Sequence, residues 1–267
     1  MKASNISFGS AGVLLCLAML TGCGSMGMRA DRAKVDAIQT VAVVGFAVPH
    51  KVESNEKSSV GSKIGFIKNM VKNDGNILKA AQESNGAQVA TAAFAGFSEE
   101  MARDSRMKLM PAEEVVANEK FAALLANYDE SEKFKATKNG VPGLAVIQLE
   151  MGTEKLEFAQ KAAEALGVDG VIVIDFYSMA YDRISGGGAT GIYTAGQAKV
   201  KEYALYNLFD RNGQSVWASP SYALSNVTAG IAGDAIEGDP TELHKDAGAQ
   251  MAAVVKKDYQ EWAKKAK

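Results

Sequence analysis

The chain has 267 residues, of which 47% are hydrophobic and 22% are charged, and its formal net charge is −2 at pH 7. This nearly balanced charge argues against nucleic-acid binding, which requires a basic surface, and it is neutral about protein partners. The length is sufficient for one large domain, or for a medium-sized domain with insertions.

The first residues have the features of a cleavable signal peptide. Lys2 supplies a positive charge, and no acidic residue occurs before Asp31. The apolar run Ala11–Leu20 is too short to span a hydrocarbon core, which needs about 20 helical residues. Leu20-Thr21-Gly22-Cys23 follows it directly and resembles the bacterial lipobox. An ordinary secretory signal with a chance cysteine is the alternative.

The lipobox resemblance implies cleavage between Gly22 and Cys23 and acylation of the Cys23 thiol, with palmitate as the expected kind of chain. Two or three acyl chains anchor a protein firmly. In lipoproteins of this kind an aspartate after the cysteine favours retention in the inner membrane. Gly24 stands there instead, which predicts a lipid anchor in the outer membrane and a domain facing the periplasm.

Cys16 is the second of the two cysteines, and it leaves with the signal. We therefore predict no disulfide and no thiolate chemistry in the mature protein. The predicted organisation is a signal peptide over 1–22, a lipidated cysteine with a short tether over 23–36, and a single periplasmic domain over 37–267.

The first predicted strand is Thr40–Val48, a nearly continuous apolar run that is typical of a strand buried on both faces. Residues 51–85 are rich in Lys, Ser, Asn and Gly, which predicts an insertion with one helix. A basic amphipathic stretch lying on a membrane surface is the alternative.

Helical periodicity predicts the next elements. Helices are expected over Gln88–Arg103, Ala112–Asn127 and Glu154–Leu166, with a short strand over 107–110 and Gly167 as the C-terminal cap of the third helix.

Val168–Met179 is the second strongly apolar strand candidate. Gln197–Phe209 alternates in the manner of a strand. One face has Ala198, Val200, Glu202, Ala204, Tyr206 and Leu208, and the other has Lys199, Lys201, Tyr203, Leu205, Asn207 and Phe209. Asn212-Gly213 predicts a hairpin turn with a return strand over 214–218. Residues 220–239 have little pattern, and Asp239-Pro240 predicts the start of a final helix that extends to about Ala266.

This order of elements predicts an α/β (α+β) fold, with a mixed β-sheet and helices packed on it. Ala163–Phe176 (AEALGVDGVIVIDF) and Asp210–Trp217 (DRNGQSVW) carry a resemblance to a known group. They resemble the periplasmic fold of curli-secretion-type (CsgG-like) lipoproteins, of the TolB amino-terminal domain, and of lipoprotein activators of penicillin-binding proteins. The resemblance implies a fold rather than an activity. The 51–85 insertion and the glycine-rich stretch 183–196 depart from it.

The sequence offers little support for a catalytic or cofactor-binding site. Gly186, Gly188 and Gly191 match G-x-G-x-x-G, but strand-like sequence follows where a dinucleotide site needs a helix, so a hairpin tip is the better interpretation. His50 and His244 are the only histidines, and no nucleophile motif accompanies them, so both are predicted to be surface residues. We predict no cofactor and no metal site.

Asp169 and Asp175 flank the second strand and are conceivable as an acid–base pair, although a structural role is favoured. Tyrosines crowd the same strand and the hairpin after it. Because tyrosine is common in protein interfaces, they form the candidate partner surface, although a structural role is favoured. Its residues are Tyr177, Tyr181, Tyr193, Tyr203 and Tyr206.

The leading hypothesis is a non-enzymatic, lipid-anchored envelope protein that binds other envelope proteins in an assembly or export complex. One alternative is a CsgG-like oligomeric secretion channel, in which residues 183–206 would supply a membrane hairpin. Another is a lipid-anchored hydrolase, which would need His50 or His244 beside a serine and an acid.

Overall fold

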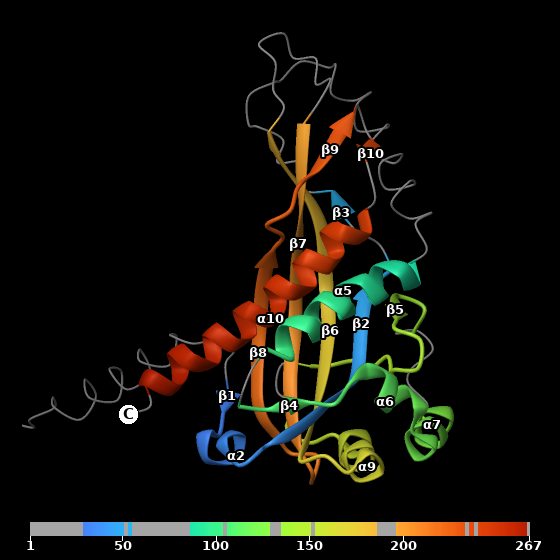
Figure 1. The fold of residues 1–267 in the computed structure, drawn as a ribbon, viewed down its shortest axis with the longest axis vertical. Helices are drawn as coiled ribbons and strands as arrows, with labels where there is room; N and C mark the ends of the chain where they lie inside the picture. Colours follow the sequence, from blue (N-terminus) through green and yellow to red (C-terminus); the bar gives the residue numbers. More distant parts are fainter. Residues whose placement is uncertain are drawn as a thin grey trace, which may run out of the picture.

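The computed structural model describes residues 29–50, 53–54, 86–103, 106–128, 135–150, 153–185, 196–232, 235–237 and 240–265. In this part of the chain a mixed β-sheet is flanked by helices, so the predicted α/β (α+β) class is confirmed (Figure 1). Gly22, Cys23 and nearly all of the 51–85 insertion lie outside the described residues.

The sheet contains ten described strands, and its main path runs in the order β1-β8-β7-β6-β2-β4. Strands β2, β4 and β6 are mutually parallel along this path, whereas β6, β7 and β8 form an antiparallel meander. The bounds are β1 (Arg29–Ala30), β2 (Thr40–Pro49), β3 (Glu53–Ser54), β4 (Lys108–Leu109), β5 (Lys138–Gly140), β6 (Gly170–Ser185), β7 (Gly196–Asp210), β8 (Ser215–Leu224), β9 (Ala229–Ala232) and β10 (Ala235–Glu237).

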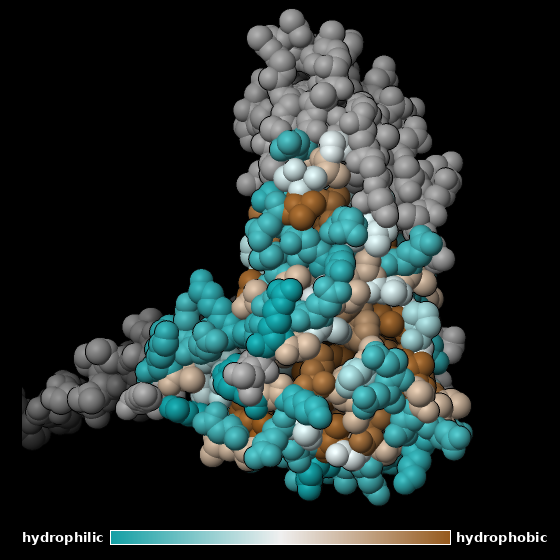
Figure 2. Space-filling view, viewed as in Figure 1, coloured by the Kyte–Doolittle hydropathy of each residue, from teal (hydrophilic) through white to brown (hydrophobic). Residues whose placement is uncertain are grey.

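The described helices are α2 (Arg32–Asp36), α5 (Gly86–Met101), α6 (Ala112–Ala117), α7 (Glu119–Ala126), α9 (Glu157–Leu166) and α10 (Pro240–Lys265). The long α10 and α5 pack against each other and cover one face of the sheet (Figure 1). Figure 2 shows hydrophilic residues over α10 and hydrophobic residues beside it, as expected of an amphipathic helix that buries one face.

The predicted helix over 112–127 is divided into α6 and α7. Asn118 separates them because its backbone is extended, with φ −74° and ψ 112°. Its side-chain oxygen accepts a hydrogen bond from the Phe121 amide at 2.9 Å, so it caps the second helix. The helical spacing of the apolar residues continues across Asn118, so the break between the two helices could not be recognised from the sequence.

Aromatic side chains fill the interface between the sheet and α5. Phe46 of β2 lies 5.3 Å from Phe94 and 6.1 Å from Phe97, measured between ring centroids, and 5.1 Å from Phe176 of β6. All four side chains are buried. The two strands predicted from apolar runs therefore form the centre of the core.

A second aromatic stack joins α10 to the sheet. Trp217 of β8 lies 4.7 Å from the rings of both Tyr206 and Tyr259. Trp217 is completely buried, and Tyr206 is 1% exposed. Trp217, the last residue of the DRNGQSVW segment, thus holds the C-terminal half of α10 on the sheet.

The opposite face of the sheet is partly covered by the segment before α9. Val173 and Asp175 lie on this opposite face of β6, because their side chains alternate with those that point toward α5. The Asp175 residue is 4% exposed. The Lys138 ammonium contacts the Asp175 carboxylate at 2.6 Å, and the Leu149 amide donates to the same carboxylate at 3.3 Å. A buried ion pair therefore fixes β5 and the Leu149 segment on β6.

The fold begins earlier in the chain than expected. Arg29 and Ala30 pair with Ala218 and Trp217 of β8, and α2 follows at once. The predicted tether over 23–36 was therefore too long, because a two-residue strand and a five-residue helix carry too little pattern to be recognised.

The hairpin and the region after it are also more ordered than expected. β8 extends to Leu224, beyond the predicted end at 218, and β9 and β10 occur within the stretch that has little pattern. α10 begins at Pro240, as predicted, whereas the proposed cap Asp239 lies outside the described residues.

Candidate functional site: an exposed tyrosine ladder

Three tyrosines from adjacent strands form a continuous exposed row, which we call the tyrosine ladder: Tyr177 of β6, Tyr203 of β7 and Tyr222 of β8. The Tyr203 ring centroid lies 5.9 Å from that of Tyr177 and 4.9 Å from that of Tyr222. Tyr177 is 52% exposed and Tyr222 is 43% exposed. Large aromatic surface is thus presented to solvent on the central strands of a sheet, where burial is usual.

Strand register produces the ladder. Tyr203 and Tyr222 are directly paired across β7 and β8, which places their side chains on the same face. The β6–β7 register shifts between Phe176 and Ser178, so Tyr177 occupies the irregular position. Alternation places Tyr177 on the face opposite the buried Phe176, and the bulge reverses the alternation after it, so Tyr181 faces α10 although it lies four positions from Tyr177.

A lysine lies over the ladder. The Lys201 ammonium is 5.5 Å from the Tyr203 ring centroid and 5.2 Å from that of Tyr222. Cation–π contacts of this kind are worth about 0.5–1 kcal/mol at exposed sites. Partial burial, and next the neighbouring Tyr203, raise the pKa of Tyr177, so the phenol stays neutral and able to donate a hydrogen bond.

The predicted partner surface is only partly correct. Tyr181 and Tyr206 are buried, at 6% and 1% exposure, and they face α10 instead of solvent. Tyr193 lies outside the described residues. Tyr222 was not predicted, although it completes the row. Side-chain alternation along β7 would have separated Tyr206 from Tyr203, because the two are an odd number of positions apart.

His244 does not lie on the surface as predicted. Its side chain is completely buried at the contact between α10 and the sheet, beside Tyr181 and Glu202. Its position on the inward face of α10, with Ala247 and Met251, accounts for this burial. His50 is exposed, as predicted.

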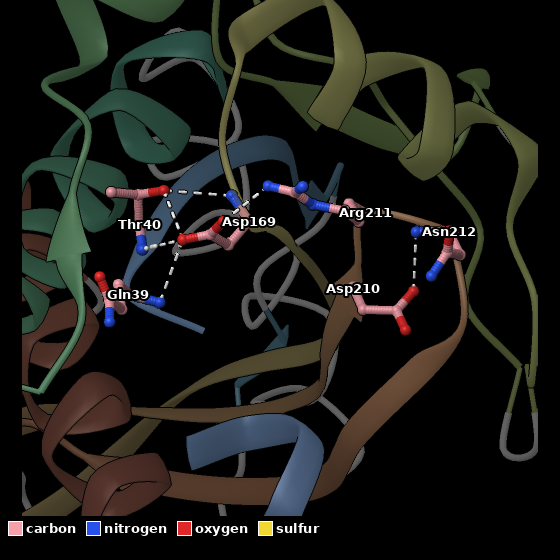
Figure 3. A network of polar contacts seen from close by, with 6 residues as sticks. All are labelled: Gln39, Thr40, Asp169, Asp210, Arg211 and Asn212. Carbon is pink, nitrogen blue, oxygen red and sulfur yellow. Dashed lines mark hydrogen bonds and ion pairs between the residues drawn. The ribbon is translucent and has the colours of Figure 1, made fainter. Parts of the chain in front are cut away.

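Asp169 and Asp175 have separate structural partners. Asp169 accepts hydrogen bonds from the Thr40 amide at 3.0 Å and the Thr40 hydroxyl at 2.9 Å, and it contacts Arg211 at 2.7 Å (Figure 3). Partial burial opposes ionisation of Asp169, but its bonds to Thr40 and Gln39 and the Arg211 charge outweigh this and lower its pKa. This carboxylate joins the start of β2 to the β7–β8 turn.

The turn itself is fixed by a second carboxylate. Asp210 accepts from the Asn212 amide at 2.9 Å and from the Gln214 amide at 3.0 Å (Figure 3 shows the first bond). Gly213 has a φ of 73°, a conformation that glycine adopts easily, and the Asn-Gly hairpin prediction is confirmed. The network in Figure 3 therefore acts as a structural clamp.

The remaining sequence features are the glycine motif, a possible metal site and a possible membrane-spanning helix. Gly186, Gly188 and Gly191 lie outside the described residues. Within the described ranges, no group of three His, Cys, Asp or Glu residues is arranged to hold a metal ion. None of the helices that the structure describes has the length and apolar character needed to cross a membrane.

Comparison with known proteins gives little similarity. No protein-family model matches the chain, and no curated protein matches it. Among solved structures it is similar to the crystal structure of a putative lipoprotein from Caulobacter crescentus CB15, with 15% sequence identity and a TM-score of 0.21. The similarity covers 39% of this chain and 79% of the Caulobacter chain, and it does not establish a family.

Proposed function

We propose that this chain is a lipid-anchored protein of the bacterial cell envelope that acts by binding another envelope protein, not by catalysis. The exposed tyrosine ladder is the observation that carries the contact role. The lipobox at Leu20–Cys23 supports the anchor, and the outer membrane, with the domain facing the periplasm, is its proposed location. The order of strands and helices also suits the CsgG-like and TolB-like fold, which we retain as part of this proposal.

The position of β1 supports close attachment to the membrane. Arg29 follows Cys23 by six positions and is already paired with β8. Six residues span no more than ~22 Å, at ~3.6 Å per residue. A domain held this close to a membrane meets partners that lie on or in it, which suits a protein that works by contact.

The composition of the ladder supports a protein partner. Tyrosine is enriched in protein interfaces because its ring contributes a large contact area and its hydroxyl group a hydrogen bond. Leu205 and Leu224 are partly buried, and they follow the same face of β7 and β8 as the ladder. The surface therefore combines an aromatic centre with apolar and cationic edges.

Replacement of Cys23 by serine tests the anchor. We expect the Cys23→Ser protein to move from the membrane fraction to the soluble fraction, because no acyl chain can then be attached. Cys16→Ser is the matched control, because Cys16 belongs to the signal peptide and is not expected to carry an acyl chain. The Cys16→Ser protein should remain in the membrane fraction. Retention of the Cys23→Ser protein in the membrane fraction would contradict the anchor.

Replacement of the ladder tests the contact role. A photo-crosslinking residue at position 177 or 222 should capture the same envelope protein, because both positions face one surface. Val116 of α6 is 44% exposed and is the matched control position, which should not capture it. Changing Tyr203 to serine should weaken binding of the captured partner about 5- to 30-fold, the effect of an interface residue worth about 1–2 kcal/mol.

The ladder experiment has clear contrary outcomes. Capture of the same proteins from positions 116, 177 and 222, or unchanged binding in the Tyr203→Ser protein, would exclude the ladder as the contact surface. Replacement of Tyr203 also removes its ring contacts with Tyr177 and Tyr222, which are worth about 0.5–1.5 kcal/mol each. Binding is therefore compared at a temperature at which thermal unfolding shows the Tyr203→Ser protein to be folded, and this separates lost binding from lost folding.

A further inference from the structure

Three polar side chains form a buried cluster between the sheet and the N-terminal half of α10: Tyr181 of β6, Glu202 of β7 and His244 of α10. Glu202 and His244 are 0% exposed, and Tyr181 is 6% exposed. The Tyr181 hydroxyl lies 3.0 Å from His244 Nε2, and Glu202 Oε1 lies 3.9 Å from His244 Nδ1. The cluster thus places polar atoms of two strands and a helix together in a buried part of the molecule.

The polar atoms of this cluster are not fully satisfied. In the described part of the chain, neither carboxyl oxygen of Glu202 has a hydrogen-bond partner, and His244 Nδ1 has none. Burial of an ionised carboxylate without donors is very costly. The arrangement is therefore stable only when Glu202 and His244 hold one proton between them, so that their combined charge is zero.

One shared proton is consistent with the geometry. If Glu202 is protonated, its O–H group faces Nδ1 of a neutral imidazole, and Nε2–H donates to the Tyr181 oxygen. If the proton moves to His244, an ion pair forms and the number of bound protons does not change. The titration consequently belongs to the pair and not to either residue alone.

Among the groups that the structure describes, none besides His244 offers Glu202 an opposite charge. Among the described residues, the titratable groups that act on Glu202 from neighbouring elements are Tyr181, His244 and Asp246. The residue paired with Glu202 on β8 is Ala223. On α5, the Glu99 carboxylate contacts Lys245 at 2.8 Å. The side chain of Lys245, the residue after His244, is thus directed to α5 and not to the cluster.

We propose that Tyr181, Glu202 and His244 form a proton-operated latch. While the Glu202–His244 pair holds one proton, the N-terminal half of α10 stays on β6 and β7. A change in the number of bound protons releases it.

Release would also affect the connection between β8 and β9. Asp246 accepts hydrogen bonds from the Asn226 amide and, at 3.0 Å, from the Val227 amide. These bonds would be lost if the first turns of α10 left the sheet. Because β8 carries Tyr222, the latch would connect proton concentration to the strand that supports the ladder.

The pKa shifts set the pH range of the latch. Burial, and next the charge of Asp246, raise the pKa of Glu202 well above its ordinary 4.5. Burial lowers the pKa of His244 from 6.5 to about 4. The closed pair therefore keeps one proton across a wide range. The open, solvated pair holds two protons below pH 4.5, one between pH 4.5 and 6.5, and none above pH 6.5.

Opening is consequently favoured at higher pH. Between pH 4.5 and 6.5 both states hold one proton, so the opening equilibrium is independent of pH. Above pH 6.5 the closed state holds one proton more than the open state until Glu202 ionises. The stabilisation is thus lost as pH rises, and the opening constant increases about tenfold per pH unit.

Hydrogen exchange of the complete protein tests the latch. Protection factors of the 243–248 amides, corrected for intrinsic exchange, should be constant from pH 5 to 6 and fall about tenfold per unit above about pH 6.5. The 255–262 amides at the other half of α10 are the internal control and should follow a shallower profile.

Two variants give opposite profiles. In Glu202→Gln only His244 titrates, so protection should be lost as pH falls from 6.5 toward 4 and should no longer fall at alkaline pH. In His244→Gln only Glu202 titrates, so the loss should begin near pH 4.5 and continue as pH rises. Lys245→Gln, at the next position, is the matched control and should keep the profile of the unmodified protein.

Each outcome decides the proposal. A Glu202→Gln protein with the same alkaline loss as the unmodified protein would overturn the latch. If that variant does not fold, NMR titration of the unmodified protein gives the answer, with the two histidine signals assigned through His50→Gln. A His244 imidazole that becomes protonated near pH 6.5 would overturn the latch, and one that stays unprotonated down to about pH 4 supports it.

Discussion

Replacement of Lys138 by methionine is expected to destabilise the protein by about 3–5 kcal/mol, the usual effect of removing one member of a buried ion pair. The Lys138 side chain is 8% exposed and that of Asp175 is 5% exposed, so water cannot replace the lost ammonium. Lys138 also donates to the Phe176 carbonyl at 2.6 Å, and that acceptor would lose this donor as well. Urea unfolding followed by far-ultraviolet circular dichroism measures the loss.

A double variant distinguishes loss of the pair from loss of packing. Lys138→Met with Asp175→Leu removes both charges and keeps apolar volume, so it should recover part of the stability lost in the single variant. The recovery is incomplete because the Phe176 carbonyl and the Leu149 amide lose these partners. Lys161→Met is the control for an exposed pair, because Lys161 contacts Glu157 at 2.7 Å with a side chain 57% exposed. That change should cost less than about 1 kcal/mol. A double variant as unstable as the single one would show that the charge pair is not the cause.

The parts of the fold predicted from sequence are those in which one pattern determines the structure. The runs around Val43 and Ile172 are apolar at nearly every position, and both strands are buried on both faces. Gly167 ends α9 with a φ of 67°, the conformation in which glycine is preferred at a helix end. Short elements such as β1 and α2 were missed because they depend on tertiary pairing more than on local pattern.

The ladder was only partly predictable because its register depends on an irregularity. Asp210 and Gln214 are hydrogen-bonded at the turn, and regular counting from them pairs Tyr203 with Ser221. The register shifts between Leu208 and Phe209, and the actual partner of Tyr203 is Tyr222. A shift of one residue moves every side chain to the other face. Sequence alone does not locate such a shift, so the exposed role of Tyr222 could not be inferred.

The buried cluster left a clearer signal in the sequence. Alternation along β7 predicts that Glu202 lies on the apolar face with Val200 and Ala204, and the structure confirms that all three are buried. An acidic residue on an apolar strand face needs a partner, and a histidine on the apolar face of an amphipathic helix is the kind of partner to expect. What sequence could not provide is the pairing of α10 with this part of β7, which is a tertiary contact between distant segments.

Replacement of Gly248 by alanine should destabilise the protein by at least about 2 kcal/mol, even though alanine favours a helix interior over glycine by about 1 kcal/mol. A Cβ atom on Gly248 would lie 2.0 Å from the Ala93 carbonyl oxygen, and one on Gly96 would lie 1.7 Å from the Lys245 carbonyl oxygen. The two glycines thus mark a close crossing of α5 and α10, where backbone contacts backbone. Thermal unfolding monitored by circular dichroism measures the effect.

The sign of this effect is decisive because helix propensity and packing predict opposite results. Lys257→Ala on the exposed face of α10 controls for general effects in this helix and should change stability by no more than about 0.5 kcal/mol. A Gly248→Ala protein as stable as the unmodified protein, or more stable, would mean that the helices do not cross this closely. The crossing lies four residues from His244, so the close contact of α5 and α10 also holds the histidine against Tyr181 and Glu202. Separation of the two helices should therefore open the latch at every pH.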